Sequence, residues 1–125
     1  MKKLPALFFY ALVCIVSGMS CIHNDHDTDI SISEDDHYYS MDAHFSKHKM
    51  RNVEEYMDSR IGRRSNTSFT NSQMDAMLTL DDHTTFYIKK YPGRLEIKLD
   101  KNENSDESYH GIKSMCDGIK KLLAK

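Results

Sequence analysis

The feature that most constrains the fold is an alternation of apolar and polar residues on both sides of a Pro-Gly pair, in the stretch TTFYIKKYPGRLEIKLD (84–100). Side chains of a β-strand point alternately to the two faces of a sheet, so each half of the stretch predicts a strand with one apolar face. The Pro-Gly pair predicts a two-residue turn, because glycine adopts the positive φ that a tight turn needs. The resulting register pairs Ile88 with Ile97 on the apolar face. On the polar face it pairs Lys89 with Glu96, which have opposite charges.

A third strand is predicted upstream of this hairpin, in the stretch AMLTL (76–80). Every second residue there is apolar, as in a strand that buries one face. A three-residue loop after the stretch keeps Leu78 opposite Phe86, so the apolar face continues across all three strands. The sequence therefore predicts a three-stranded antiparallel meander with one apolar and one polar face.

Helices are predicted on both sides of the meander. From Asp42 to Ile61 apolar residues recur at the spacing of one helical face, and a glycine follows. From Tyr109 to Leu123 a second apolar stripe recurs, and lysines near its end suit the C-terminal end of the helix dipole. Asn104 and Glu107, three residues apart at the start of this helix, resemble a capping box.

Two glycines interrupt the last predicted helix. Inside a helix Gly111 and Gly118 each cost about 1 kcal/mol relative to alanine. Because they are seven residues apart, they lie on one flank of the helix. We expect the first helix to approach closely there.

These elements define the fold class as α+β: a small single domain with a helix, a three-stranded antiparallel meander and a C-terminal helix packed on one sheet face. The domain is expected over 41–125, a length that encloses one modest core. Residues 21–40 carry six acids and no Lys or Arg. Like charges extend a chain, so this segment is predicted to be an acidic disordered tether. The chain as a whole has 17 basic and 19 acidic residues, so no nucleic-acid partner is expected.

The chain opens with two lysines and an almost wholly apolar run, MKKLPALFFYALVCIV, followed by small residues. This is the pattern of a secretory signal peptide, expected over 1–20, and the run is shorter than the ~20 apolar residues that span a membrane. The residues GMSC (18–21) resemble the lipobox of bacterial lipoproteins, in the relaxed form of Bacteroidota lipoproteins. The resemblance implies that Cys21 is a lipid anchor with acyl chains. It also implies an outer membrane lipoprotein of the cell envelope, periplasmic or surface-exposed, which meets the membrane through this N-terminal lipid.

A disulfide is the alternative role for Cys21. Cys14 belongs to the expected signal peptide, so the mature chain keeps Cys21 and Cys116. A bond between these two suits an oxidising compartment. Cys116 lies on the apolar stripe of the last predicted helix, where a free cysteine acts as a small hydrophobe. We therefore favour the lipid anchor.

Few residues are candidates for chemistry. The histidines and aspartates match no metal-binding motif, so no metal ligand and no cofactor is expected. Asp81, Asp82 and His83 form a compact group of acids and a base, but aspartate in such a loop is first of all a turn former. The sequence has no nucleophile elbow and no glycine-rich phosphate loop. No catalytic residue is assigned, and a small hydrolase that uses these three residues is the alternative from the enzyme class.

The polar face of the meander is the candidate partner surface. If both helices cover the apolar face, the polar face is left open, and Tyr and Arg are enriched at interface hot spots. Alternation places the following residues on it: Tyr87, Lys89, Tyr91, Arg94 and Lys98. The cations among them favour an acidic partner. We expect a binding or assembly module for a protein or a cell-envelope glycan. The alternatives are a periplasmic inhibitor or immunity-type protein that caps its partner and, less favoured, the small hydrolase.

Overall fold

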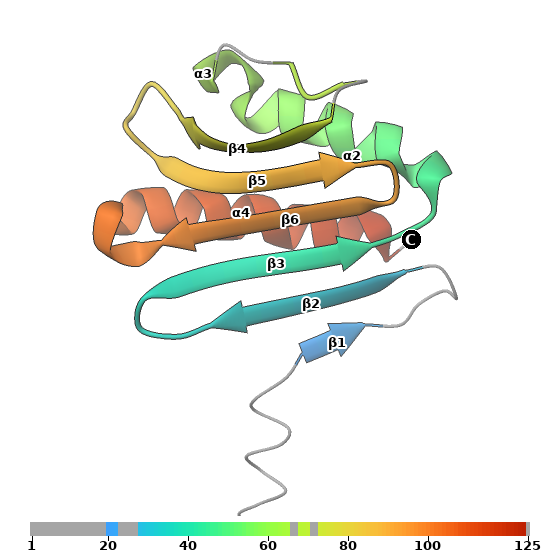
Figure 1. Cartoon of the computed structure of the whole chain (residues 1–125), viewed down its shortest axis with the longest axis horizontal. Helices are drawn as coiled ribbons and strands as arrows, with labels where there is room; N and C mark the ends of the chain where they lie inside the picture. The colour runs from blue at the N-terminus through green and yellow to red at the C-terminus, as the bar shows by residue number, and fades with distance from the viewer. Residues whose placement is uncertain (1–19, 23–27, 66–67, 71–72, 125) are drawn as a thin grey trace, which may run out of the picture.

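The protein forms one antiparallel sheet with its helices on one side (Figure 1). The computed structural model describes residues 20–22, 28–65, 68–70 and 73–124. In chain order the elements are β1 (Ser20–Ile22), β2 (Asp29–Glu34), β3 (Tyr38–His44), η1 (Lys47–Lys49), α2 (Met50–Met57), η2 (Asp58–Gly62), α3 (Arg63–Ser65), β4 (Met74–Thr79), β5 (Thr85–Tyr91), β6 (Arg94–Asp100), η3 (Lys101–Glu103) and α4 (Asp106–Leu123). The strands lie in the order β1-β2-β3-β6-β5-β4. The predicted fold class, a small α+β domain with the C-terminal helix packed on the sheet, is confirmed.

The predicted meander is strands β4, β5 and β6, in the predicted register. Ile88 pairs with Ile97, Lys89 with Glu96, and Leu78 with Phe86. Gly93 in the turn has a φ of 85°, a conformation that costs glycine little because it has no Cβ atom. The alternation of the hairpin therefore determined both the pairing and the face of each side chain.

The last helix, α4, was predicted correctly except for its cap. Ser105 is the N-cap, and its side chain accepts a hydrogen bond from the Ser108 N–H group. The capping box expected from Asn104 and Glu107 is wrong. The Asn104 side chain instead accepts a hydrogen bond from the Thr85 N–H group at 2.9 Å. It also donates to the backbone oxygen of Thr85, so it joins the start of α4 to strand β5.

The sequence prediction places the start of the first helix too early, at Asp42. Residues 42–44 belong to β3, and α2 begins only at Met50. Met41, Ala43 and Phe45 are all buried, which is the period-two pattern of a strand and of the residue that follows it. Ala43 also fits the spacing of the predicted helical stripe, so the helix was predicted to begin too early. After Met57 the helix continues as the π-helical segment η2 and the short helix α3.

The predicted tether over residues 21–40 is also corrected. Residues 29–34 and 38–44 form the hairpin β2–β3, whose second strand pairs with β6. Ile30 and Tyr39 are each 1% exposed, so this hairpin contributes to the core. Its acids do not prevent folding because they lie in the turn, on the solvent side of the sheet or, in the case of Glu34, 2.7 Å from the Lys101 ammonium. Asp35, for example, accepts hydrogen bonds from the N–H groups of His37 and Tyr38 at 2.8 Å. Residues 23–27, and residues 1–19 of the expected signal peptide, lie outside the described part.

The core lies between the sheet and the helices α2 and α4, which run behind the sheet in Figure 1. One charged pair is buried there. The Nζ atom of Lys90 on β5 lies 2.8 Å from the Oε2 atom of Glu54 on α2, and the two residues are 0% and 6% exposed. Opposite charge and direct contact make burial of both groups tolerable. The buried residues of the strands and helices include Met41, Ala43, Val53, Met57, Phe86, Ile88, Leu95, Ile97, Leu99, Ile112, Met115, Cys116 and Ile119.

Candidate binding surface

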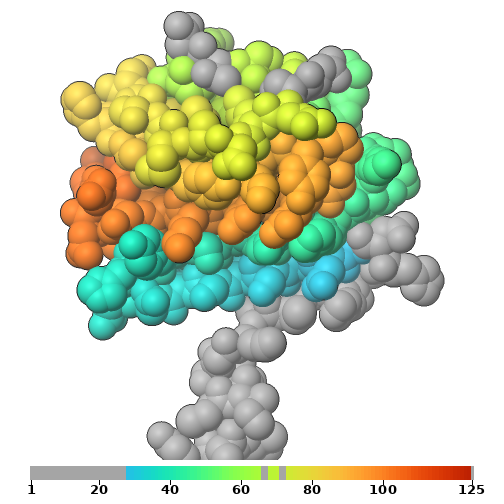
Figure 2. All heavy atoms as spheres, viewed as in Figure 1, coloured from blue at the N-terminus to red at the C-terminus, as the bar shows by residue number. Residues whose placement is uncertain are grey.

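The second face of the sheet is open. In the described part of the chain no helix lies on it, and Figure 2 shows this face with strands β2 to β6 toward the viewer. Antiparallel sheets commonly pack one face against the core and leave the other face exposed to solvent. The side chains on this face alternate with the core residues along each strand. They include Asp29, Ser31, Ser33, Tyr38, Ser40, Asp42, His44, Asp75, Met77, Thr79, Thr85, Tyr87, Lys89, Tyr91, Arg94, Glu96, Lys98 and Asp100.

A row of two tyrosines, one methionine and one lysine crosses the open face. Met77 pairs with Tyr87, and Tyr87 pairs with Lys98 on the next strand. The Lys98 ammonium lies 4.5 Å from the ring centroid of Tyr38 on β3, close enough for a cation–π contact. We call these four residues the aromatic row. It runs across four neighbouring strands, with Met77 at 60% and Tyr38 at 41% exposure at its two ends.

The structure places all five predicted surface residues on the open face, but in different surroundings. Tyr87 and Lys98 belong to the aromatic row, whereas Tyr91 and Arg94 form a neighbouring pair at the turn of the hairpin. The Tyr87 hydroxyl donates to Asp75 Oδ1 at 2.7 Å. This hydrogen bond raises the pKa of Tyr87 to about 12, so the ring is held in place and stays neutral.

The arginine of the open face is paired with acidic side chains of the same face. Arg94 contacts both carboxylate oxygens of Asp42, at 3.3 and 3.1 Å, and lies 3.6 Å from Glu96. The Tyr91 hydroxyl also accepts a hydrogen bond from Arg94. The strands place more acidic than basic side chains on this face. The face is therefore mixed in charge, with its central arginine already paired.

Two members of the aromatic row were missed by the sequence prediction. Tyr38 was assigned to the tether, although the alternation in YYSMDAH (38–44) indicates a strand with Tyr38 and Tyr39 on opposite faces. Met77 lies between Ala76 and Leu78 in the predicted third strand, so the same alternation turns it to the open face. Both could have been found by applying the period-two rule to every strand.

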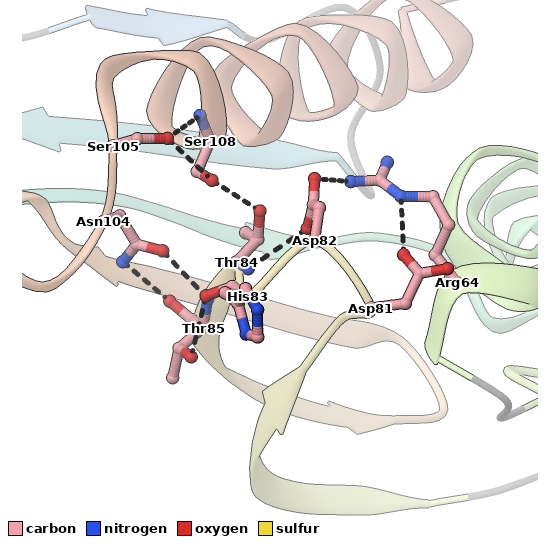
Figure 3. A network of polar contacts seen from close by, with 9 residues as sticks. All are labelled: Arg64, Asp81, Asp82, His83, Thr84, Thr85, Asn104, Ser105 and Ser108. Carbon is pink, nitrogen blue, oxygen red and sulfur yellow. Dashed lines mark hydrogen bonds and ion pairs between the residues drawn. The ribbon is translucent and has the colours of Figure 1, made fainter.

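The group Asp81, Asp82 and His83 forms the loop between β4 and β5 (Figure 3). Asp82 accepts hydrogen bonds from the guanidinium of Arg64 and from the Thr84 N–H group at 3.1 Å. Burial alone would raise the pKa of Asp82, but the hydrogen bonds from Thr84 and the charge of Arg64 lower it. His83 has a φ of 71°, and its N–H group donates to the Leu80 oxygen. The contacts of these residues are those of a turn, which supports their interpretation as turn formers.

The two cysteines of the expected mature chain lie in different elements, Cys21 in β1 and Cys116 in α4. Cys116 is a free thiol with no exposed surface, and burial raises its pKa to about 12. Cys21 lies in β1, opposite Ser31 of β2. Within the described ranges, no three or more His, Cys, Asp or Glu residues are grouped so that they could hold a metal ion. No helix of the described residues has the length and apolar character needed to cross a membrane.

No protein-family model matches the chain, and no similar curated protein or solved structure was found.

Proposed function

We propose that the protein is a lipid-anchored binding module of the bacterial cell envelope, without catalytic residues, and that the open face of its sheet holds a protein partner. One observation carries the proposal. The large apolar side chains that are exposed in the described part of the chain are Tyr38, Met77 and Tyr91, and all three lie on the open face. Single exposed apolar residues need no explanation, but their concentration on one face is typical of an interaction surface.

The composition of this face favours a protein over a charged polymer. Tyrosine and methionine are enriched in the cores of protein interfaces, and they occupy the aromatic row. Charged side chains flank the row and several are already paired, as Arg94 is with Asp42. Such a rim excludes water around a few anchoring contacts. Because acids outnumber bases here, an acidic glycan or a nucleic acid would meet unfavourable charges.

The test of this surface compares capture of partners by three forms of the protein. Bait proteins with the wild-type sequence, with Met77→Ser and Tyr87→Ala together, and with Arg51→Ala would be incubated with native envelope fractions and cross-linked. Arg51 is the control because it lies on α2, on the opposite side of the sheet, with a side chain 73% exposed.

We expect one stoichiometric protein with the wild type and with Arg51→Ala, and its loss with the double variant. Each anchor is worth about 1 kcal/mol or more, so together they weaken binding at least about tenfold. Equal capture by all three forms would show that the partner binds elsewhere. Recovery of glycan and no protein would show that the partner class is wrong.

The anchor has its own test. Intact-mass measurement of protein extracted from membranes should show acyl chains on Cys21 as the first residue. The variant Cys21→Ser should be recovered in the soluble fraction with its fold unchanged. Unmodified wild-type protein in the soluble fraction would contradict the anchor and leave the binding surface untouched.

A further inference from the structure

The edge of the sheet at strand β4 is accessible to a further strand. β4 (Met74–Thr79) is the last strand of the sheet on the side away from β1 (Figure 1). Every second side chain of β5 and β6 is buried, whereas none of the six residues of β4 is buried. Ala76 faces the helix side of the sheet, opposite Ile88, and is nevertheless exposed. The helices therefore stop short of this edge, and β4 is accessible from both faces.

Three residues of β4 present their backbone groups at this edge. In an antiparallel pair, residues that exchange hydrogen bonds with the other strand alternate with residues whose N–H and C=O groups point away from it. The Leu80 N–H group donates to the Thr84 oxygen at 2.8 Å, so the even-numbered residues of β4 bond to β5 in the observed register. Asp75, Met77 and Thr79 therefore point their backbone groups away from β5. Within the described ranges, no backbone group of a loop or turn bonds to these three residues.

β4 lacks the features that usually protect an edge strand from pairing with another chain. Such strands are commonly very short, or carry a lysine, a proline or a bulge. The opposite edge strand, β1, has three residues, whereas β4 has six and contains neither lysine nor proline. Its register with β5 runs without a bulge. Its one charged residue, Asp75, accepts a hydrogen bond from the Tyr87 hydroxyl at 2.7 Å.

We propose that β4 pairs with β4 of a second copy of the chain, antiparallel and about a two-fold axis at Met77. In this register Met77 of one copy lies opposite Met77 of the other, and Asp75 lies opposite Thr79. All three outward-pointing residues then exchange hydrogen bonds with the other copy. On the helix side Ala76 lies opposite Leu78, so two exposed apolar residues cover each other.

The charges of β4 favour this register over its neighbours. With the axis at Met77, no two like charges face each other. Moving the axis to Leu78 would place Asp75 opposite Asp81, which is unfavourable. Moving it to Ala76 would leave Thr79 opposite Gln73, outside both strands. The strand is therefore complementary to itself in one register.

The same axis joins the aromatic rows of the two copies. Met77 is the end of the row on β4 and is 60% exposed. In the pair it lies beside the second Met77, and the row runs from Tyr38 of one copy to Tyr38 of the other across four strands of each. The pairing itself depends only on β4 and does not require the open face to hold another protein.

The position of β4 keeps this interface away from the proposed anchor. Cys21 lies in β1, at the opposite edge of the sheet. The two-fold axis therefore places the two Cys21 residues at the two far edges of the joined sheet. If Cys21 carries lipid, as the proposed function holds, the pair joins copies on two facing membrane surfaces.

The first test measures self-association of the full chain with Cys21→Ser, which excludes lipid as its cause, by sedimentation equilibrium up to about 0.5 mM. The wild-type strand should give a dimer. Met77→Lys and Met77→Glu each place two like charges at the axis and should weaken the dimer about tenfold or more. An equal mixture of these two variants should associate more tightly than either alone, because opposite charges then face each other.

The control is Tyr38→Lys, at the other exposed end of the aromatic row. It should associate as the wild type does, whereas loss of association would show that the open faces contact each other. A monomeric wild-type strand would overturn the proposal, and association insensitive to charge at Met77 would place the interface elsewhere. Tyr87→Ala should weaken capture of an envelope partner and leave self-association unchanged, so this proposal and the proposed function can fail separately.

Cysteine cross-linking then defines the register. Met77→Cys should form an interchain disulfide on mild oxidation, because the Cα atoms of a directly opposed, hydrogen-bonded pair are about 5.5 Å apart. Thr79→Cys should not link to itself, but a mixture of Thr79→Cys and Asp75→Cys should link. Cys116 does not compete because it has no exposed surface. Faster self-linking at Thr79 than at Met77 would overturn the register.

Discussion

Two adjacent tyrosines show how differently the two faces of the sheet use the same residue type. Tyr39 is 1% exposed and packs under α4, in a T-shaped contact with the Tyr109 ring. Tyr38 is 41% exposed on the open face, beside Lys98. The strand period places the two side chains on opposite faces, and the helices decide which face is buried. A substitution on the covered face should therefore affect stability, and one on the open face should affect recognition.

The largest expected effect comes from neighbouring positions on β6. Ile97→Ala deletes a side chain with no exposed surface and should lower the free energy of unfolding by about 2–5 kcal/mol. Lys98→Ala, one residue further along, removes only the cation–π contact with Tyr38 and should change it by about 1 kcal/mol or less. Urea denaturation measures both. Similar effects at the two positions would mean that the faces are not as distinct as the structure indicates.

The two glycines of α4 give the next largest contrast. A Cβ atom at Gly118 would lie 1.8 Å from the hydroxyl oxygen of Tyr56, so Gly118→Ala displaces the Tyr56 ring from its contact with Arg60 and should cost about 1 kcal/mol. Gly111→Ala meets open space and should stabilise the protein by up to about 1 kcal/mol. The expected close approach of the first helix thus holds for Gly118 but not for Gly111. Thermal unfolding of the two variants, with opposite signs, would confirm the difference.

A smaller effect is expected from pH at the edge of the covered face. The carboxylate of Glu34 lies 2.7 Å from Lys101 and accepts a hydrogen bond from Tyr109 on α4, and these contacts lower the pKa of Glu34. A lowered folded-state pKa adds stability that is present above the unfolded-state pKa, about 4.3. This stability is lost as the pH falls through the folded-state pKa. Because the pair is partly exposed, the contribution is below about 1 kcal/mol.

The measurement is the free energy of unfolding as a function of pH, with Glu34→Gln and with Glu103→Gln as the control for the same change in charge. The wild type and Glu103→Gln should lose stability below about pH 4.3 more steeply than Glu34→Gln does. Identical slopes for all three proteins would contradict the role of Glu34 in joining the β2–β3 hairpin to α4.

The smallest expected effect concerns the Tyr39 hydroxyl. It is buried beside the Cys116 thiol, which is a weak hydrogen-bonding group. Tyr39→Phe keeps the ring and should change the free energy of unfolding by less than about 0.5 kcal/mol, with stabilisation more expected than loss. A cost above about 1 kcal/mol in calorimetry would show that the hydroxyl has a stronger partner.

Local patterns of the sequence predicted the parts of the fold that depend on neighbouring residues. The register of Ile88 with Ile97 follows from a two-residue turn, and the buried stripe of α4 follows from helical spacing. The β2–β3 hairpin was missed because its acids suggested an extended tether, although Ile30 and Ile32 alternate with polar residues. In this segment the alternation of apolar and polar residues indicates the strand, whereas the acidic composition wrongly suggested a disordered tether.

The candidate sites were predictable to different degrees. The open face follows from strand alternation, so its residues could be assigned from the sequence, including Tyr38 and Met77. The hollow that Arg60, Thr84 and Glu107 line could not be predicted, because these residues come from three segments that only the packing of α4 brings together.

The pairing of β1 with β2 has a consequence for how the domain stands at a membrane. Backbone bonding places Cys21 opposite Ser31, at the edge of the sheet furthest from β4. If Cys21 is the acylated residue, the bilayer lies next to that edge. The sheet then meets the membrane with its edge strand β1 and not with one of its faces. Neither face then lies against lipid, and the aromatic row is reachable from the side. A partner that is itself embedded in the same membrane could approach the open face without the domain turning over.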